Sequence, residues 1–165
     1  MGIPQGDLRL LDSELAKRLL NSTIPARVAY IAKDGTPRVI PTWFYWDGSQ
    51  VVMATFIAGP HVRHAPGRPA ALRANPNVAI TIDTEAFPPK VLLIRGQASV
   101  TEVDGLVREF EEAARRYLGE QGAKDFLSQA SKPGVRMARM AVRPTWVGTL
   151  DFQTRLPSHV GGVAA

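Results

Sequence analysis

Cysteine is absent from the 165-residue chain. Its absence excludes disulfides, thiolate metal sites and cysteine nucleophiles together. No apolar run approaches the length of a membrane span, and the first twenty residues lack the pattern of a signal peptide. We therefore expect a cytoplasmic protein without a membrane partner.

Several sequence motifs that indicate a particular cofactor or reaction are also missing. No Gly-x-Gly-x-x-Gly follows a predicted strand, and the chain has neither a nucleotide-binding P-loop nor a Gly-x-Ser-x-Gly elbow. The three histidines, His61, His64 and His159, lack the spacing of a metal triad, and the first two fit a surface loop. We predict no metal site and no catalytic constellation of side chains.

The composition is that of a globular protein, with 45% hydrophobic and 21% charged residues. We expect one domain over residues 1–154 and a flexible tail over residues 155–165, which are rich in Gly, Ser and Ala. The net charge of +5 allows an anionic partner such as a phosphorylated cofactor. Because no block of five or six basic residues occurs, the sequence disfavours nucleic acid as that partner.

Three β-prone runs, Ala26–Lys33, Pro37–Trp46 and Gln50–Phe56, are separated by Asp34-Gly35 and Asp47-Gly48. These dipeptides favour tight hairpin turns, so we predict an antiparallel meander. Both faces of the middle run are apolar, which means that both must be covered. A closed or nearly closed barrel would cover one face, and a helix, a ligand or a second subunit the other.

The remaining pattern alternates strands with helices. It predicts helices at 12–21, just after residue 69, at 104–118 and, more weakly, at 123–130, and strands at 78–83, 91–103 and 135–148. The long strand at 91–103 contains Gly96, which suggests a bend or a close approach by another group. The fold class is therefore mainly β (α+β), a small barrel of six antiparallel strands with short flanking helices.

A basic loop lies between the third and fourth of these strands. It carries Arg63, His64 and Arg68, and the short helix that follows begins near Pro69. We expect Pro69 to hold the backbone of Arg68 extended, just before the N-terminus of this helix. The free N–H groups and the positive dipole end at that N-terminus suit a phosphate. Read alone, the arginines fit a solvated surface slightly better than a phosphate site, because basic loops are common.

The segments PRVIPTWFYWDGSQVVMAT, ALRANPNVAITID and VLLIRGQASV, with the basic loop between the first two, resemble the flavin-binding split barrel of the pyridoxamine 5′-phosphate oxidase superfamily. The resemblance covers roughly residues 26–103. It implies a six-stranded antiparallel split β-barrel and a homodimer with two flavin sites at the subunit interface. It also implies which positions of this sequence lie near the cofactor.

By this resemblance, the backbone of the predicted second strand lies against the isoalloxazine ring, and the end of the next strand lies beside the ring and ribityl chain. Arg68 matches the basic residue that meets the cofactor phosphate, four positions before Leu72. The start of the fifth strand and the basic loop supply further contacts. The candidate residues are Val39, Ile40, Pro41, Thr42, Ala54, Thr55, Arg63, His64, Arg68, Leu72, Lys90 and Val91.

Three features depart from the resembled pattern. The loop from Ile57 to Gly67 is longer than usual and carries two prolines. Ala71 stands where the family usually has Asn, and the C-terminal motif that binds the substrate phosphate in true pyridoxamine phosphate oxidases is not recognisable. A vitamin B6 substrate is therefore doubtful.

Three functions stay open. The first is an FMN-dependent oxidoreductase that acts on a small organic substrate. The second is a reductase using the deazaflavin coenzyme F-420, whose acidic tail would need further cations, with Arg63, Arg73 and Lys90 as candidates. The third is a non-enzymatic carrier or sensor that binds flavin, haem or nucleic acid.

Overall fold

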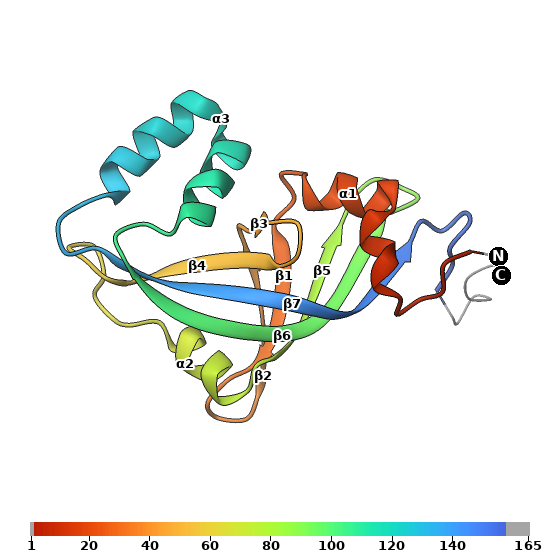
Figure 1. Cartoon of the computed structure of the whole chain (residues 1–165), viewed down its shortest axis with the longest axis horizontal. Helices are drawn as coiled ribbons and strands as arrows, with labels where there is room; N and C mark the ends of the chain where they lie inside the picture. The colour runs from red at the N-terminus through yellow and green to blue at the C-terminus, as the bar shows by residue number, and fades with distance from the viewer. Residues whose placement is uncertain (1, 158–165) are drawn as a thin grey trace.

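The computed structural model describes residues 2–157 of the chain. Its centre is one antiparallel sheet of seven strands, in the order β2-β1-β5-β6-β7-β4-β3, which curls into an open barrel (Figure 1). The elements are η1 (Leu8–Asp12), α1 (Glu14–Leu20), β1 (Ala26–Ile31), β2 (Pro37–Thr42), β3 (Tyr45–Trp46), β4 (Val51–Ala58), α2 (Gly67–Ala74), β5 (Asn77–Asp83), β6 (Val91–Asp104), α3 (Arg108–Ala130) and β7 (Arg136–Leu150). The predicted mainly β split barrel is confirmed.

Both predicted tight turns form. Gly35 and Gly48 adopt φ values of 77° and 99°, which glycine reaches without steric cost. The aspartate before each glycine holds its turn, since Asp34 Oδ1 accepts from the Thr36 N–H at 3.0 Å and Asp47 Oδ1 from the Ser49 N–H at 2.8 Å. The turns close the β1–β2 and β3–β4 hairpins.

The predicted meander is wrong in one respect, because the run Pro37–Trp46 is two strands. β2 pairs with β1, whereas β3 pairs with β4 at the other edge of the sheet, so the sheet has seven strands and the barrel is not closed. The break follows Thr42, where Phe44 turns into the core and is 1% exposed. Pro41 does not cause it, since it pairs with Arg27 on an edge strand, where a missing N–H is tolerated.

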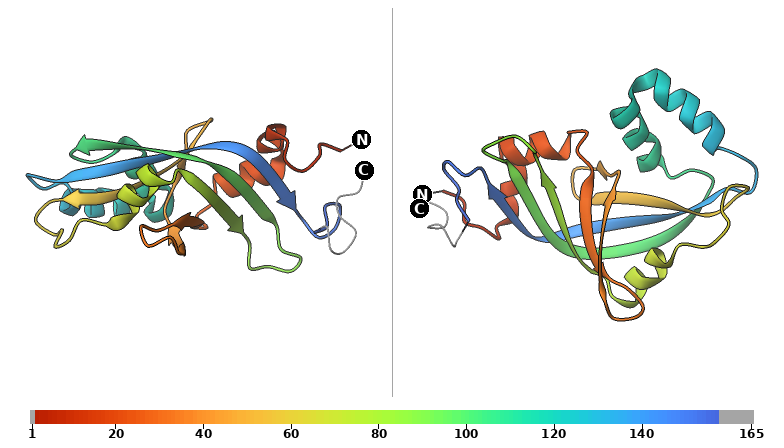
Figure 2. Two further views of the ribbon diagram at one scale, coloured as in Figure 1. Left: turned by 90° about the horizontal axis from the view of Figure 1, so that it is seen from below. Right: turned by 180° about the vertical axis from the view of Figure 1, so that it is seen from behind.

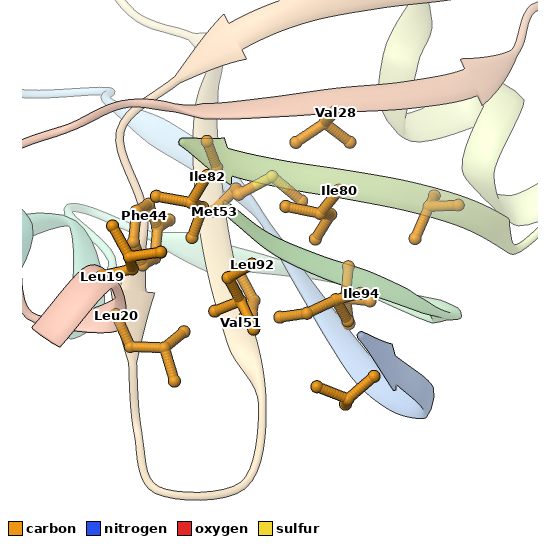
Figure 3. Close-up of a cluster of buried hydrophobic side chains, with 14 of the residues drawn as sticks. Leu19, Leu20, Val28, Phe44, Val51, Met53, Ile80, Ile82, Leu92 and Ile94 are labelled. Atoms are coloured by element: carbon orange, nitrogen blue, oxygen red, sulfur yellow. The ribbon is translucent and has the colours of Figure 1, made fainter. Parts of the chain in front are cut away.

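The core fills the inside of the open barrel. Leu19 and Leu20 of α1 meet residues of β1, β4, β5 and β6 there (Figure 3). Besides these two leucines, the labelled side chains of the close-up, which belong to the same buried apolar cluster, are Val28, Phe44, Val51, Met53, Ile80, Ile82, Leu92 and Ile94. Helix α1 begins at Glu14, two residues after the predicted start, with Ser13 as the cap that accepts from the Ala16 N–H at 3.3 Å.

β6 and β7 form the longest ladder in the structure. They pair from Val91 to Asp104, and the register shifts between Arg95 and Gly96. A Cβ at Gly96 would lie 2.3 Å from the Arg143 carbonyl oxygen. The predicted close approach at Gly96 is thus made by the backbone of β7.

Helix α3 joins β6 to β7 and stands over β4 (Figures 1 and 2). It begins at Arg108 instead of Asp104, because β6 continues through Asp104. At Gly119 the backbone is non-helical, with φ 73°, so the two predicted helices are the two arms of one bent element.

The predicted tail falls largely outside the described residues, namely positions 158–165. At its start, the Arg155 carbonyl accepts from the Asp151 N–H at 3.1 Å. Within residues 2–157, none of the helices has the length and apolarity to cross a membrane.

Candidate functional site

β2 lies at an edge of the sheet and, within residues 2–157, pairs on one side only, with β1. Alternate backbone N–H and C=O groups of such a strand point away from its partner and can bond to another molecule. Val39, in the middle of β2, is 65% exposed. The strand therefore offers an accessible polar backbone at a place where the barrel is open.

An aromatic hollow of about 420 Å³ lies at the end of β2. The end of β2 and the link to β3 form part of its wall, β4 another part, and the first turns of α3 the rest. It is lined by Pro25, Pro41, Thr42, Trp43, Phe44, Val52, Ala54, Glu109, Phe110 and Ala113. Glu109 is the one residue of this lining that carries a charge.

Aromatic contacts pack α3 against Trp43 and β4 beside the hollow. Trp43 stacks on Tyr117 with ring centroids 5.0 Å apart and planes within 5°, and Phe126 meets Trp43 edge-on at 5.8 Å. Phe110 contacts Phe56 of β4 at 5.5 Å. These contacts tie both arms of α3 to the floor of the site, each with a favourable aromatic geometry.

A basic hollow of about 350 Å³ lies between the β1–β2 hairpin and the start of α2. Its lining is Tyr30, Ala32, Lys33, Asp34, Arg38, Gly67, Arg68 and Ala71. It brings three cationic side chains, Lys33, Arg38 and Arg68, to the uncapped N-terminus of α2, since Pro66 at the cap position makes no side-chain bond. Cations and free helix N–H groups together favour an anion.

Arg68 is the most unusual residue of the basic hollow. Its Nη1 atom is buried and has no hydrogen-bond partner among the described residues. Burial lowers the pKa of the guanidinium from its ordinary value, although arginine stays charged in proteins. A buried cation with an unused donor is costly, and a bound anion would remove that cost.

Asp34 and Arg38 set the charge at the rim of this hollow. They form an ion pair at 2.8 Å between Asp34 Oδ2 and Arg38 Nη2. Hydrogen bonds from the Thr36 side chain and backbone, followed by the bond from Arg38, lower the pKa of Asp34 to about 2. Asp34 is thus ionised at neutral pH and holds Arg38 beside the hollow.

The two hollows lie at opposite ends of β2. Arg38 at the start and Thr42 at the end are four residues apart, or roughly 13 Å along an extended strand. The edge strand therefore connects an anion site to an aromatic site. That arrangement suits a ligand with a phosphate at one end and a flat ring at the other.

The structure brings several of the predicted site residues together. Pro41, Thr42 and Ala54 line the aromatic hollow and Arg68 the basic hollow. Val39 and Ile40 lie on β2 between the two hollows.

Other predicted residues lie elsewhere. Thr55 follows Ala54 and is half-buried, and Arg63 and His64 are exposed in the loop before α2. Leu72 is 1% exposed and belongs to the core, so its role is packing. Arg68 itself is the second residue of α2 and not an extended residue before it, because the helix begins two residues earlier than Pro69.

Lys90 and Val91 are separated from α2 by the whole length of β5. β5 begins three residues after α2 and ends at Asp83, which pairs with Val91. Lys90 lines a separate hollow of about 680 Å³ together with Lys17 and Arg18. Within one chain, these two positions are therefore not joined to the Arg68 site.

Sequence reasoning missed Lys33, Arg38 and Glu109. Arg38 could have been recognised from the sequence, because it directly precedes the segment Val39–Thr42, which is predicted to lie against the flavin ring. It is on the side of this segment from which the cofactor phosphate would extend. Glu109 had no such signal in the sequence. It lies 67 positions beyond Thr42 in the printed sequence, and only the fold of α3 over β4 places it in the same hollow.

An open antiparallel barrel with an accessible edge strand between an aromatic and a basic hollow defines a split-barrel protein. The chain belongs to the pyridoxamine 5′-phosphate oxidase family, whose model matches residues 13–151. No curated protein is similar enough in sequence to count as a relative.

Solved structures with the same fold include proteins of different described function. An "F420 Reductase" is 24% identical, with a TM-score of 0.57, over 79% of this chain and 93% of its own. A FAD-binding protein from Mesorhizobium loti is 19% identical, with a TM-score of 0.51, over 83% and 93%. The haem storage protein HutZ from Vibrio cholerae is 21% identical, with a TM-score of 0.52, over 82% and 90%. At these identities the likeness shows the fold alone.

Proposed function

We propose that the protein is an oxidoreductase that binds FMN along β2 and exchanges hydride with a small organic substrate in the aromatic hollow. The observation that carries this proposal is the buried Nη1 of Arg68, which has no hydrogen-bond partner in the described part of the chain. It lies in a basic hollow one strand length from the aromatic hollow. Membership of the pyridoxamine 5′-phosphate oxidase family supports a flavin as the ligand.

Each part of the site has a role in this proposal. Arg68 and Arg38 bind the phosphate, where a guanidinium can donate two parallel hydrogen bonds, and the α2 N-terminus adds backbone donors. The outward backbone groups of β2 bond to the ring edge and tune its potential. The bound flavin supplies the hydride chemistry, so no acid or base among the side chains is required.

We further propose a homodimer. Lys90 and Val91 do not reach the Arg68 site within one chain, so by family resemblance they would complete the site of a two-fold partner. The exposed Val39 and the unpaired edge of β2 are available to such a complex. The compartment that we propose for this dimer is the cytoplasm.

A deazaflavin coenzyme is the second candidate, because one structure with this fold is an F420 reductase. Its glutamate tail needs cations beyond the phosphate site. Arg73 is already paired with Glu102 at 3.0 Å, which leaves Arg63 and Lys90 as the better candidates. A haem-binding carrier is the third, favoured by the likeness to HutZ.

Parallel titrations of the purified protein with FMN, riboflavin, coenzyme F-420 and haem test these alternatives. We expect saturable binding of FMN, with weaker binding of riboflavin because it lacks the phosphate. Tighter binding of F-420 that weakens as salt rises would select the deazaflavin instead. If no flavin or deazaflavin shows saturable binding, the proposed function is wrong.

A further inference from the structure

The aromatic hollow has two walls of different character. β2 and β4 contribute Pro41, Thr42 and Ala54, the positions assigned above to the cofactor. Helix α3 contributes Glu109, Phe110 and Ala113, none of which has been assigned to it. The α3 wall is therefore available to a second molecule, and its chemistry decides what that molecule can be.

Glu109 gives the α3 wall a fixed negative charge. The residue is 8% exposed, and its Oε1 accepts from Arg139 Nη2 at 2.7 Å and from Arg139 Nε at 3.1 Å. The hydrogen bonds from Arg139 keep the pKa of Glu109 below its ordinary value, against the opposing effect of burial. Both bonds from Arg139 end on Oε1, so Oε2 receives no bond from Arg139.

Arg139 is shared between two carboxylates, those of Glu109 and Asp47. The same Nη2 atom lies 4.0 Å from Asp47 Oδ2, so two carboxylates face one guanidinium. Arg139 is paired with Ala54 across β4 and β7, which places the cluster next to the floor of the hollow. Arg108 also lowers the pKa of Glu109, so its carboxylate stays ionised as the one charged group in the otherwise mostly apolar lining of the hollow.

We propose that the α3 wall selects flat, mainly apolar substrates that carry a cationic or hydrogen-bond-donating group, and that Glu109 is the specificity-determining residue that binds this group. The inference rests on the proposed function, since the flavin supplies the opposite wall. Phe110 and Trp43 provide apolar contact, and the carboxylate orients one end. Carboxylate and phosphate substrates are rejected, in agreement with the missing substrate-phosphate motif.

Three matched probes test the selection: naphthylmethylamine as the cation, naphthylmethanol as the neutral donor and naphthoate as the anion. Their binding to the FMN-loaded full chain is followed by the flavin absorbance, and to the flavin-free chain by tryptophan fluorescence. We expect the order cation, neutral donor, anion, with about tenfold or more between the first and the last. The opposite order, equal affinities or no binding in the wild-type protein would overturn the inference without any variant.

Glu109→Gln removes the charge and keeps an oxygen that Arg139 can donate to. It should reduce the preference for the cation at least tenfold while leaving FMN affinity unchanged. Glu112→Gln is the matched control, because Glu112 is on the same helix and pairs with Arg115 at 2.9 Å but lies outside the hollow. A preference retained in Glu109→Gln, or lost equally in the control, refutes the role of Glu109.

Failure of FMN binding would refute the proposed function separately. The flavin-free fluorescence titration would still report whether the hollow prefers a cation. The two conclusions are thus tested by different measurements.

Discussion

Arg68→Ala tests the placement of the phosphate site. Nη1 of Arg68 is buried and has no hydrogen-bond partner within residues 2–157, so this guanidinium adds little to the stability of the fold. In the proposed complex it donates to a phosphate, and a hydrogen bond between charged groups contributes roughly 1.5–3 kcal/mol. We therefore expect Arg68→Ala to weaken FMN binding by about ten- to hundredfold.

The same reasoning predicts an unusual combination of effects. Because the substitution removes a costly buried donor, the melting temperature of the flavin-free variant should equal or exceed that of the wild type. Riboflavin lacks the phosphate, so its affinity should hardly change. Arg68→Lys should fall between, since an ammonium cannot bind in the bidentate manner.

Titration calorimetry with FMN and riboflavin, alongside thermal melts, measures all of these quantities. Arg73→Ala is the matched control, because Arg73 is on the same helix but is engaged by Glu102 on the surface. Equal loss of riboflavin and FMN affinity, or unchanged FMN affinity, would show that the phosphate binds elsewhere. A large drop in the melting temperature would show that Arg68 is structural.

Three further predictions concern assembly, stability and pH. If Arg68 and Lys90 of different subunits share a site, mixed dimers of Arg68→Ala and Lys90→Ala chains regain one wild-type FMN site per dimer; calorimetry showing only weakened sites would place both residues in one chain. Gly96→Ala should lower the free energy of unfolding by about 1–3 kcal/mol in urea titrations, since its Cβ would meet the Arg143 carbonyl oxygen at 2.3 Å; an unchanged value would mean that the ladder relaxes. The pKa of Asp34 is lowered to about 2 from 3.8, so its contribution to stability is present above pH 4 and is lost as pH falls through 2. Melting curves of Asp34→Asn should therefore lie below those of the wild type at neutral pH and converge with them in strong acid.

The local features of the fold could be predicted from the sequence. Asp34-Gly35 and Asp47-Gly48 form turns because their conformation depends on the dipeptides themselves, and Ser13 caps α1 because its oxygen reaches a neighbouring N–H. The alternation over β5 and the family resemblance likewise needed no distant contacts. The chain itself thus determined the two tight turns, the alternation of β5, the family and the candidate phosphate residue Arg68.

Contacts between distant segments decided the rest. The run Pro37–Trp46 is continuous in β propensity, yet the burial of Phe44 splits it between the two edges of the sheet. Arg38 and Arg68 share a hollow only because α2 docks beside the β1–β2 hairpin. Glu109 faces β4 only because α3 folds back over it and Arg139, 30 positions away, holds its carboxylate. Such pairings depend on which surfaces bury one another, which local propensity does not specify.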